Sequence, residues 1–308
     1  MGGGLSACAW CGRRGSENPG RSAIVLSFLH GNGNNNILPC RYLSCLALLF
    51  RLMELEKIMK NLKVCVFGDS HSVYFGATPQ LIHMKPEYNA LDLKLEVIQG
   101  ATVKGLGKRV ATLNTLAKID DSIHKYSPDI VVLAFGQVDV ELGYYYVTVV
   151  KGEEISPESY IKSLTDTYLK FIQEKSQGKY LLVVKGINPP VLSFFKTKAL
   201  TYTNRIITEN IEDESEQRRL FESLKINFPD DTARLRNHLF FNTLIEEHAQ
   251  RYGFDYYDIN RYLIEPGTNH VKLSLIPSAF DHHIADTLEV RMQYLDGILN
   301  VAQSRGLL

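Results

Sequence analysis

Four polar stretches of this chain carry residue types that could do chemistry, and the first of them contains a candidate nucleophile. It reads Gly-Asp-Ser-His-Ser at 68–72 and follows the apolar run 62–67. A serine in a tight turn can attack an electrophile if a base removes its proton and if N–H donors receive the resulting negative charge. Asp69, Ser70 and Ser72 could equally cap a following helix, because Asp and Ser are favoured at that position. Ser70 is therefore a candidate nucleophile with a structural alternative.

The second and third stretches offer hydrogen-bond donors and acids. Gly100 ends the second apolar run, and a glycine lets the backbone approach a ligand and point an N–H at it. The third run ends in Gly136-Gln137-Val138-Asp139, and Glu141 follows. Charged groups are costly inside a buried strand, so these acids are expected in a surface loop or in a site. Neither the first nor the second stretch contains G-x-G-x-x-G, which argues against a dinucleotide cofactor.

The fourth stretch brings histidines and aspartates together. Asp281, His282, His283 and Asp286 lie within six positions, just before a predicted helix. Histidine is the usual general base, and a neighbouring carboxylate fixes its tautomer and stabilises the imidazolium. A loop with this composition predicts the base that the serine at position 70 needs.

A metal-dependent phosphoesterase is the rival interpretation. Asp69 and His71 form a D-x-H pattern, and Asp281 and His283 add oxygen and nitrogen ligands. Against it, the side chains of adjacent histidines tend to diverge, and the chain lacks later Asn-His and Gly-His-x-His stretches. The rival interpretation predicts that a chelator abolishes turnover while loss of the serine is tolerated.

The elements that must position these residues alternate between apolar strands and helices. Strands are predicted at 63–68, 93–100, 129–136, 180–187 and 253–259, and helices at 107–126, 156–175, 230–253 and 284–305. Continuous apolar strands separated by helices predict a parallel sheet covered on both faces, which makes a three-layer α/β/α sandwich the simplest fold. Ligands bind beyond the carboxyl ends of the strands in such folds, and the four polar stretches stand there.

The composition of the chain changes near residue 58. Residues 1–58 have no helical or strand period and are predicted to be a disordered or spurious leader. Four of the five cysteines lie there, in the segments CAWC and CRYLSC, and the spacing of the second pair is unusual for zinc. Residues 59–308 are predicted to form one domain, with a polar, irregular insertion around 193–229.

Charge and hydropathy exclude several classes of partner. Lys plus Arg equals Asp plus Glu at 34 each, so no global charge favours a nucleic-acid partner. No apolar run reaches the ~18–20 residues needed to cross a bilayer. The folded part carries no cysteine pairs, and a reduced, cytoplasmic location without a transmembrane segment is expected.

Taken in order, the four stretches resemble the conserved blocks of the SGNH/GDSL hydrolase family. FGDSHS resembles the block with the nucleophile, GATVKGLG and FGQVD the next two, and DHHIAD the last, so that the resemblance covers about 63–286. It implies a flavodoxin-like three-layer fold with a five-stranded parallel sheet, no metal and no cofactor. It further implies that Ser70 attacks an ester carbonyl, that His283 takes its proton with Asp281 orienting the ring, and that the N–H groups of Ser70 and Gly100 hold the oxyanion.

Two departures from the family pattern bear on activity. Val138 stands where the family has an asparagine donor, and loss of one oxyanion donor typically costs about 10²–10³ in kcat. Gln137 is the predicted substitute. The acid stands two residues before His283 rather than three, so His282 remains an alternative base.

The resulting prediction is a serine hydrolase or acyltransferase that acts on a small ester, such as an O-acetylated carbohydrate. The prediction of a carbohydrate substrate is based on the family resemblance and on Tyr144, Tyr145 and Tyr146, whose amphipathic rings suit such a ligand. A catalytically weak glycan-binding domain is the non-enzymatic alternative. Substrate contacts are predicted for the remaining polar residues, which are Asp69, His71, Asp139, Glu141 and His282.

Overall fold

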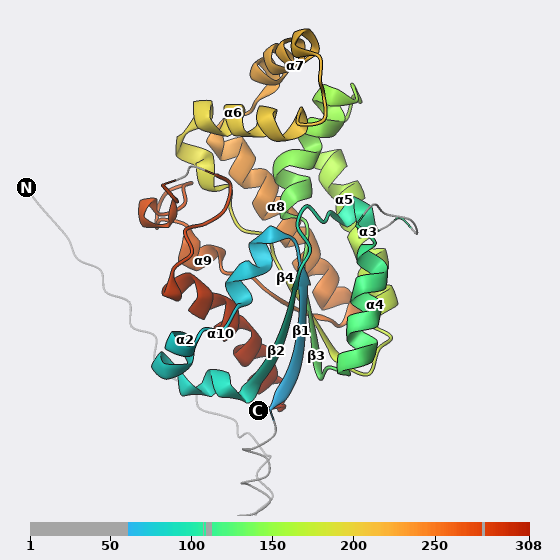
Figure 1. The fold of residues 1–308 in the computed structure, drawn as a ribbon, viewed down its shortest axis with the longest axis vertical. Helices are drawn as coiled ribbons and strands as arrows, with labels where there is room; N and C mark the ends of the chain where they lie inside the picture. Colours follow the sequence, from blue (N-terminus) through green and yellow to red (C-terminus); the bar gives the residue numbers. More distant parts are fainter. Residues whose placement is uncertain (1–60, 107, 109–112, 279–280) are drawn as a thin grey trace, which may run out of the picture. The chain divides into compact units, whose positions relative to one another are not determined.

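The computed structural model describes residues 61–106, 108, 113–278 and 281–308 (Figure 1). The predicted leader at 1–58 and its four cysteines lie outside this range. No helix in the described ranges is both long and apolar enough to cross a membrane.

A five-stranded sheet forms the centre of the domain. Its strands are β1 (Leu62–Gly68), β2 (Leu91–Val97), β3 (Ile130–Ala134), β4 (Leu181–Lys185) and β5 (Asp255–Tyr257). They are arranged in the order β2-β1-β3-β4-β5, and every neighbouring pair is parallel. This is the flavodoxin-like strand order. The predicted five-stranded parallel sheet is confirmed. Strand β2 begins two residues earlier than predicted, and the other strands begin and end within a few residues of their predicted bounds.

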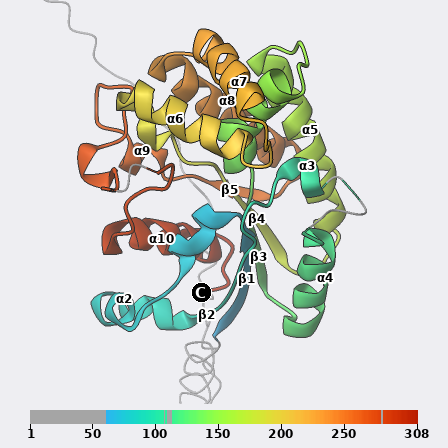
Figure 2. The ribbon, with the colours of Figure 1, turned by 45° about the horizontal axis from the view of Figure 1, so that its top comes forward.

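Helices cover both faces of the sheet, as Figures 1 and 2 show. On one face α4 (Thr115–Tyr126), α5 (Pro157–Lys175) and α8 (Asp231–Tyr252) share a core with Cys65 and Phe67 of β1. On the other face α10 (Leu288–Ser304) and α2 (Pro79–Met84) pack on Val64 and Val66. Successive residues of β1 therefore enter opposite cores, which explains the continuous apolar runs at 64–67 in β1 and at 130–134 in the neighbouring β3.

Short segments complete the fold. They are η1 (Ser70–Phe75), η2 (Pro86–Ala90), α3 (Val103–Leu106), η3 (Asp139–Gly143), η4 (Tyr146–Val150), η5 (Val191–Phe194), α9 (Asn260–Leu263) and η6 (Leu273–Leu275). Of these, η3 and η4 are single π-helical turns, which in other proteins occur frequently at functional sites. The N-terminal signal of α5 is confirmed: the Ser156 hydroxyl accepts the Ser159 N–H, and Pro157 occupies the first turn.

The segment predicted to be an irregular insertion is largely helical. It contains α6 (Lys196–Ile207) and α7 (Glu214–Asn227), so the prediction of irregular structure was wrong. Leu200, Ile207, Leu220 and Leu224 form a third apolar cluster with residues of η4 and with Tyr145, which precedes η4. The apolar stripes of these two helices are narrow and flanked by many charged residues, which hid their period in the sequence.

The end of β1 passes unusually close to β3. A Cβ atom on Gly68 would lie 2.5 Å from the carbonyl oxygen of Ala134 and 2.7 Å from the Cβ of Ser72. Only glycine avoids this overlap, so the turn after β1 can fold tightly over the neighbouring strand.

Candidate active site

Ser70 and His283 meet above the carboxyl end of the sheet. Ser70 opens η1 directly after β1, and His283 lies in the loop before α10, 213 positions away. The distance between Ser70 Oγ and His283 Nε2 is 2.8 Å, a normal hydrogen-bond length. Of the two adjacent histidines, the structure places His283 against the serine.

The turn that carries Ser70 is held by its neighbours. The Asp69 side chain accepts the backbone N–H of His71 at 2.9 Å, and the Ser72 hydroxyl donates to the Asp69 carbonyl at 2.7 Å. These are the capping bonds considered for this motif, and they leave the Ser70 side chain directed at His283. The capping and nucleophile interpretations therefore apply to different residues of one turn.

Contacts between η1 and the loop before α10 hold the side chains of Ser70 and His283 next to each other. Tyr74 donates its hydroxyl to the carbonyl of Ile284 at 2.7 Å, and both residues are buried. Arg291 donates to the Gly76 carbonyl at 2.7 Å and forms a two-pronged ion pair with Asp286. The ion pair between Asp286 and Arg291 thus links the loop before α10 to that helix.

Asp281 lies beside the second ring nitrogen of His283. Its Oδ1 accepts the backbone N–H of His283 at 2.7 Å and lies 3.4 Å from the ring Nδ1. A carboxylate next to Nδ1 favours the tautomer whose proton sits on Nδ1, which leaves the Nε2 lone pair for the serine proton. The side chain of Asp281 is about 40% exposed, so water weakens its field.

His71 and His282 complete a cluster of three imidazole rings. The His71 ring stacks on that of His283 with centroids 4.4 Å apart, and the His282 ring meets both edge-on at 4.7 and 4.3 Å. Burial lowers the pKa of His282 to about 3 and that of His71 well below its ordinary value. Both rings are therefore neutral at pH 7, and only the ring of His283 touches Ser70.

Two backbone N–H groups beside the cleft lack a backbone acceptor within the described residues. In the described part of the chain, the N–H groups of Ser70 and Gly100 make no backbone hydrogen bond, and both residues line the same cleft. Gly100 has φ +70°, a backbone conformation that favours glycine and turns this loop towards the cleft. Val138 also lines the cleft and contributes no donor.

Gln137 does not replace the missing donor in this structure. Its side-chain nitrogen donates to Glu141 at 3.0 Å and to the carbonyl of Asn188 at 3.2 Å, and its oxygen accepts the Asn188 N–H. The two bonds with Asn188 join the end of β3 to the loop after β4, and the third links Gln137 to Glu141 of η3. The prediction that Gln137 serves the oxyanion is not supported, because neither of its N–H bonds is left for a ligand.

Asp139 has a structural role instead of a place in the cleft. Its buried carboxylate accepts the N–H of Val103 at 2.7 Å and lies 3.4 Å from that of Lys104, so that it caps the start of α3. Burial raises its pKa to about 7, against the lowering effect of these donors. Asp139 therefore holds the loop that carries Gly100, and the predicted substrate contact is replaced by this positioning role.

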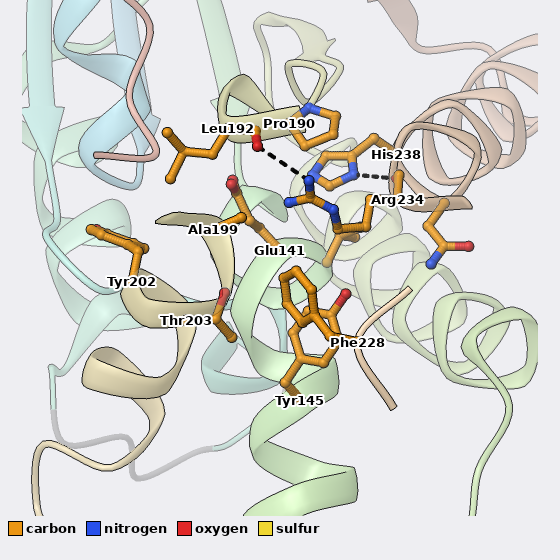
Figure 3. Close-up of a pocket in the computed structure, with 12 residues that line it drawn as sticks. Glu141, Tyr145, Pro190, Leu192, Ala199, Tyr202, Thr203, Phe228, Arg234 and His238 are labelled. Atoms are coloured by element: carbon orange, nitrogen blue, oxygen red, sulfur yellow. Dashed lines mark hydrogen bonds between the residues drawn. The ribbon is translucent and has the colours of Figure 1, made fainter. Parts of the chain in front are cut away.

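Asp69 and Glu141 are likewise buried behind the reacting pair. Burial raises the pKa of each to about 7, and Glu141 Oε2 lies 3.7 Å from Nδ1 of His282. Figure 3 shows Glu141 facing Arg234 and His238 across a small pocket. This pocket holds about 10 Å³, which is room for one water molecule and not for a substrate.

The larger hollow is the cleft beside Ser70, with a volume of about 860 Å³. Its walls are mostly apolar and include Val73, Val97, Leu142 and Ile206. The three consecutive tyrosines at 144–146 do not line it. Tyr145 packs on Phe228 inside the third apolar cluster instead, so these rings give no support to a sugar substrate.

Tyr202 and Lys185 were missed by the sequence analysis. Tyr202, from α6, lines the cleft and lies 5.1 Å from the His282 ring, but it belongs to the segment predicted to be irregular. Lys185 is buried at the end of β4, donates to Asn188 and Tyr294, and burial lowers its pKa to about 7. In the sequence it resembles an ordinary strand-end lysine, and no pattern distinguishes it.

Comparisons with known proteins match structures and not sequences. No protein-family model matches the chain, and no curated protein matches it. A Bacteroides fragilis protein whose description names an acylhydrolase is similar, with a TM-score of 0.45, 10% identity and coverage of 82% of this chain and 95% of that one. A protein of the G-D-S-L family from Desulfitobacterium hafniense gives 0.43 and 11%, with 78% and 99% covered.

An acetylxylan esterase from Geobacillus stearothermophilus, solved as a catalytic mutant, gives a TM-score of 0.43 and 13% identity, with 79% of this chain and 95% of that one covered. A G-D-S-L protein, an acylhydrolase and an acetylxylan esterase are thus among the solved structures that resemble this chain. The geometry of Ser70, His283 and Asp281 is the basis for inferring a function.

Proposed function

We propose that this chain is a serine hydrolase of the SGNH/GDSL type that cleaves a small carboxylic ester. The observation that carries the proposal is the 2.8 Å contact between Ser70 Oγ and His283 Nε2, with Asp281 3.4 Å from the other ring nitrogen. A hydroxyl, an imidazole and a carboxylate in this order are the parts that activate a serine. All three border one open cleft.

The reaction follows from these positions. Ser70 Oγ attacks the ester carbonyl carbon while His283 Nε2 takes its proton, and the N–H groups of Ser70 and Gly100 receive the negative charge on the carbonyl oxygen. The tetrahedral adduct then expels the alcohol, which receives the proton from His283, and an acyl group remains on Ser70. Water attacks this acyl-enzyme with His283 again as base, and the acid leaves with Ser70 restored. An acceptor other than water would give acyl transfer, which product analysis distinguishes.

The walls of the cleft indicate which part of the ester they hold. Val73, Val97 and Leu142 are apolar, and burial of an alkyl chain against such residues stabilises a complex by about 0.8 kcal/mol per CH₂ group. A cleft of about 860 Å³ accepts more than an acetyl group. We therefore propose that the substrate carries an apolar acyl or alkyl part; an O-acetylated carbohydrate remains a proposal based on the family alone.

The metal-dependent phosphoesterase is not carried forward as a second function. It needs Asp69 and Asp281 as metal ligands, and among the described residues the one group with metal-ligand spacing consists of three histidines without a carboxylate. Asp69 Oδ1 accepts the backbone N–H of His71, and Asp281 Oδ1 that of His283. The two carboxylates that the metal-dependent mechanism needs as ligands are thus engaged in hydrogen bonds with the backbone of their own loops.

A fluorophosphonate probe tests the proposal, because it bonds covalently only to an activated serine. The full chain is incubated with the probe, and the modified peptide is identified by mass spectrometry. We expect one adduct at Ser70 that is lost in Ser70→Ala and strongly slowed in His283→Ala. Ser163→Ala, which removes an exposed serine from α5, serves as the matched control and should label like the wild type. Labelling that survives in Ser70→Ala, or ester turnover that a chelator abolishes, would refute the assignment.

A further inference from the structure

The cluster of His71, His282 and His283 contains more imidazole than a serine hydrolase needs. One ring suffices as the base, yet three rings lie with their centroids 4.3–4.7 Å apart. One nitrogen of each ring lies within 4.8 Å of one nitrogen of both others, and two of the three residues are buried. Such a concentration of aromatic nitrogen on two adjoining loops requires an explanation besides catalysis.

The nitrogens of His71 have no protein partner. The residue is 5% exposed, and among the described residues neither Nδ1 nor Nε2 has a hydrogen-bond partner. A buried polar group without a partner typically costs about 1–3 kcal/mol. A buried imidazole without a hydrogen-bond partner, next to two other imidazoles, is suited to bind a metal ion, because a metal ion accepts nitrogen lone pairs.

The other two rings are each backed by a carboxylate at Nδ1. Glu141 lies 3.7 Å from Nδ1 of His282, and Asp281 lies 3.4 Å from Nδ1 of His283. Metal-binding histidines almost always direct their second nitrogen at a carboxylate, a carbonyl or a water, which fixes the tautomer and leaves the other lone pair for the metal. With the proton of each ring on Nδ1, Nε2 carries the lone pair for a metal, and in His283 this lone pair now faces the Ser70 hydroxyl.

We propose that His71, His282 and His283 bind a single divalent ion of the zinc type, and that this ion switches off the serine hydrolase. Three imidazoles with one open position form a ligand set that zinc accepts, and nitrogen ligands favour it over Mg²⁺ or Ca²⁺. The ion would share Nε2 of His283 with the Ser70 proton, and these two cannot occupy one lone pair together. A water from the cleft, or Ser70 Oγ itself, is the fourth ligand.

Binding requires the rings to close on the ion. A tetrahedral zinc with bonds of about 2.0–2.1 Å brings its nitrogens to roughly 3.3 Å from one another. The three nitrogens now lie within 4.8 Å of one another, so closure takes ring rotations that shorten the longest separation by up to about 1.5 Å. His283 must release the Ser70 hydroxyl during this movement, which couples metal binding to inhibition.

Binding is tested without any assay of activity. The full chain is titrated with Co²⁺, which replaces zinc and reports its ligands through visible d–d bands, and then with Zn²⁺ in competition. We expect His71→Asn and His282→Asn to weaken the affinity measured through the nitrogen-type bands at least ~10-fold. His83→Asn, which changes an exposed histidine on α2, is the matched control and should bind like the wild type. Ions bound by the N-terminal cysteines would show thiolate charge-transfer bands that persist in both cluster variants.

Inhibition is then measured in the same proteins, and this second part rests on the proposed function. We expect Zn²⁺ to block both ester turnover and fluorophosphonate labelling of Ser70, and a chelator to restore both. In His71→Asn, inhibition should require a much higher Zn²⁺ concentration, with each rate expressed relative to the metal-free rate of that variant. Equal affinity in the wild type and both cluster variants would overturn the site. Bound metal that leaves labelling unchanged, or that raises turnover, would overturn the switch. Failure of labelling in the metal-free wild type would refute the proposed function and leave the binding result standing.

Discussion

The role given to Asp139 leads to a stability prediction whose size and pH dependence can be worked out. In Asp139→Ala the N–H of Val103, which is fully buried, loses its acceptor at 2.7 Å. An unsatisfied buried donor costs about 1–3 kcal/mol. We therefore expect the variant to lose about this much free energy of unfolding at pH 5, where the wild-type carboxyl is protonated and still accepts through its carbonyl oxygen.

The cost should shrink as the pH rises. Burial raises the pKa of Asp139 to about 7 from an ordinary value of 3.8, so the folded state binds the proton more tightly than the unfolded state. A raised pKa contributes stability that is complete below the unfolded value and is lost as the pH rises through the folded value. At 1.36 kcal/mol per pH unit the wild type loses about 2–3 kcal/mol between pH 5 and 8 from this group. The alanine variant loses nothing from it, so by pH 8 the difference falls to about zero or changes sign in favour of the variant.

Urea unfolding at pH 5 and pH 8 measures the effect, with unchanged m-values as a check that the same transition is compared. Asp139→Asn is the matched control, because it keeps a carbonyl acceptor for the Val103 N–H and carries no charge at either pH. It should cost less than the alanine variant at pH 5. A larger cost of Asp139→Ala at pH 8 than at pH 5 would show that the fold stabilises the carboxylate as an anion, and burial could then not be the dominant influence on this group.

Three further predictions concern the site and its support. Val138→Asn places an amide where the cleft lacks a donor and should raise kcat, by up to ~10²-fold, with little change in KM; an unchanged kcat would mean that position 138 does not reach the oxyanion. Asp281→Asn should lower kcat/KM by between ~10-fold and ~10⁴-fold. The loss should be smaller than for a buried orienting acid, because Asp281 is partly exposed. A kcat/KM within about twofold of the wild-type value would exclude Asp281 from the mechanism. Burial lowers the pKa of Lys185 to about 7, so its unfolded state binds more protons between about pH 7 and 10. The wild type should therefore gain stability relative to Lys185→Met as the pH rises through this range, and thermal or urea unfolding in which the gap stays constant would contradict the lowered pKa.

The sheet was predictable from the sequence because its central strands β1, β3 and β4 are buried on both faces. Successive residues such as Cys65 and Val66 enter different cores, so each of these three strands contains an apolar run that the sequence displays. The parallel arrangement then brings the ends of these runs to one edge. For this reason Ser70 and the loop with His283 could be placed together before their contact at 2.8 Å was known.

The roles of the polar side chains could not be predicted in the same way. Gln137 and Asp139 follow a buried strand just as site residues would, but their partners Asn188 and Val103 lie on other loops. Whether a side chain faces the cleft or the interior depends on the path of the backbone after each strand, and the π-helical turn at 139–143 sets that path in this chain. The helices at 196–207 and 214–227 were missed because their apolar stripes are narrow among many charged residues.

The close approach at Gly68 has a consequence for how this site can vary between proteins. Any side chain there would have to displace either the carbonyl of Ala134 in β3 or Ser72, which lies in the same short helix as the nucleophile. The residue at this position never meets a substrate, yet its size decides where the attacking oxygen stands. A larger residue at position 68 would therefore disturb the attack on a substrate from outside the cleft.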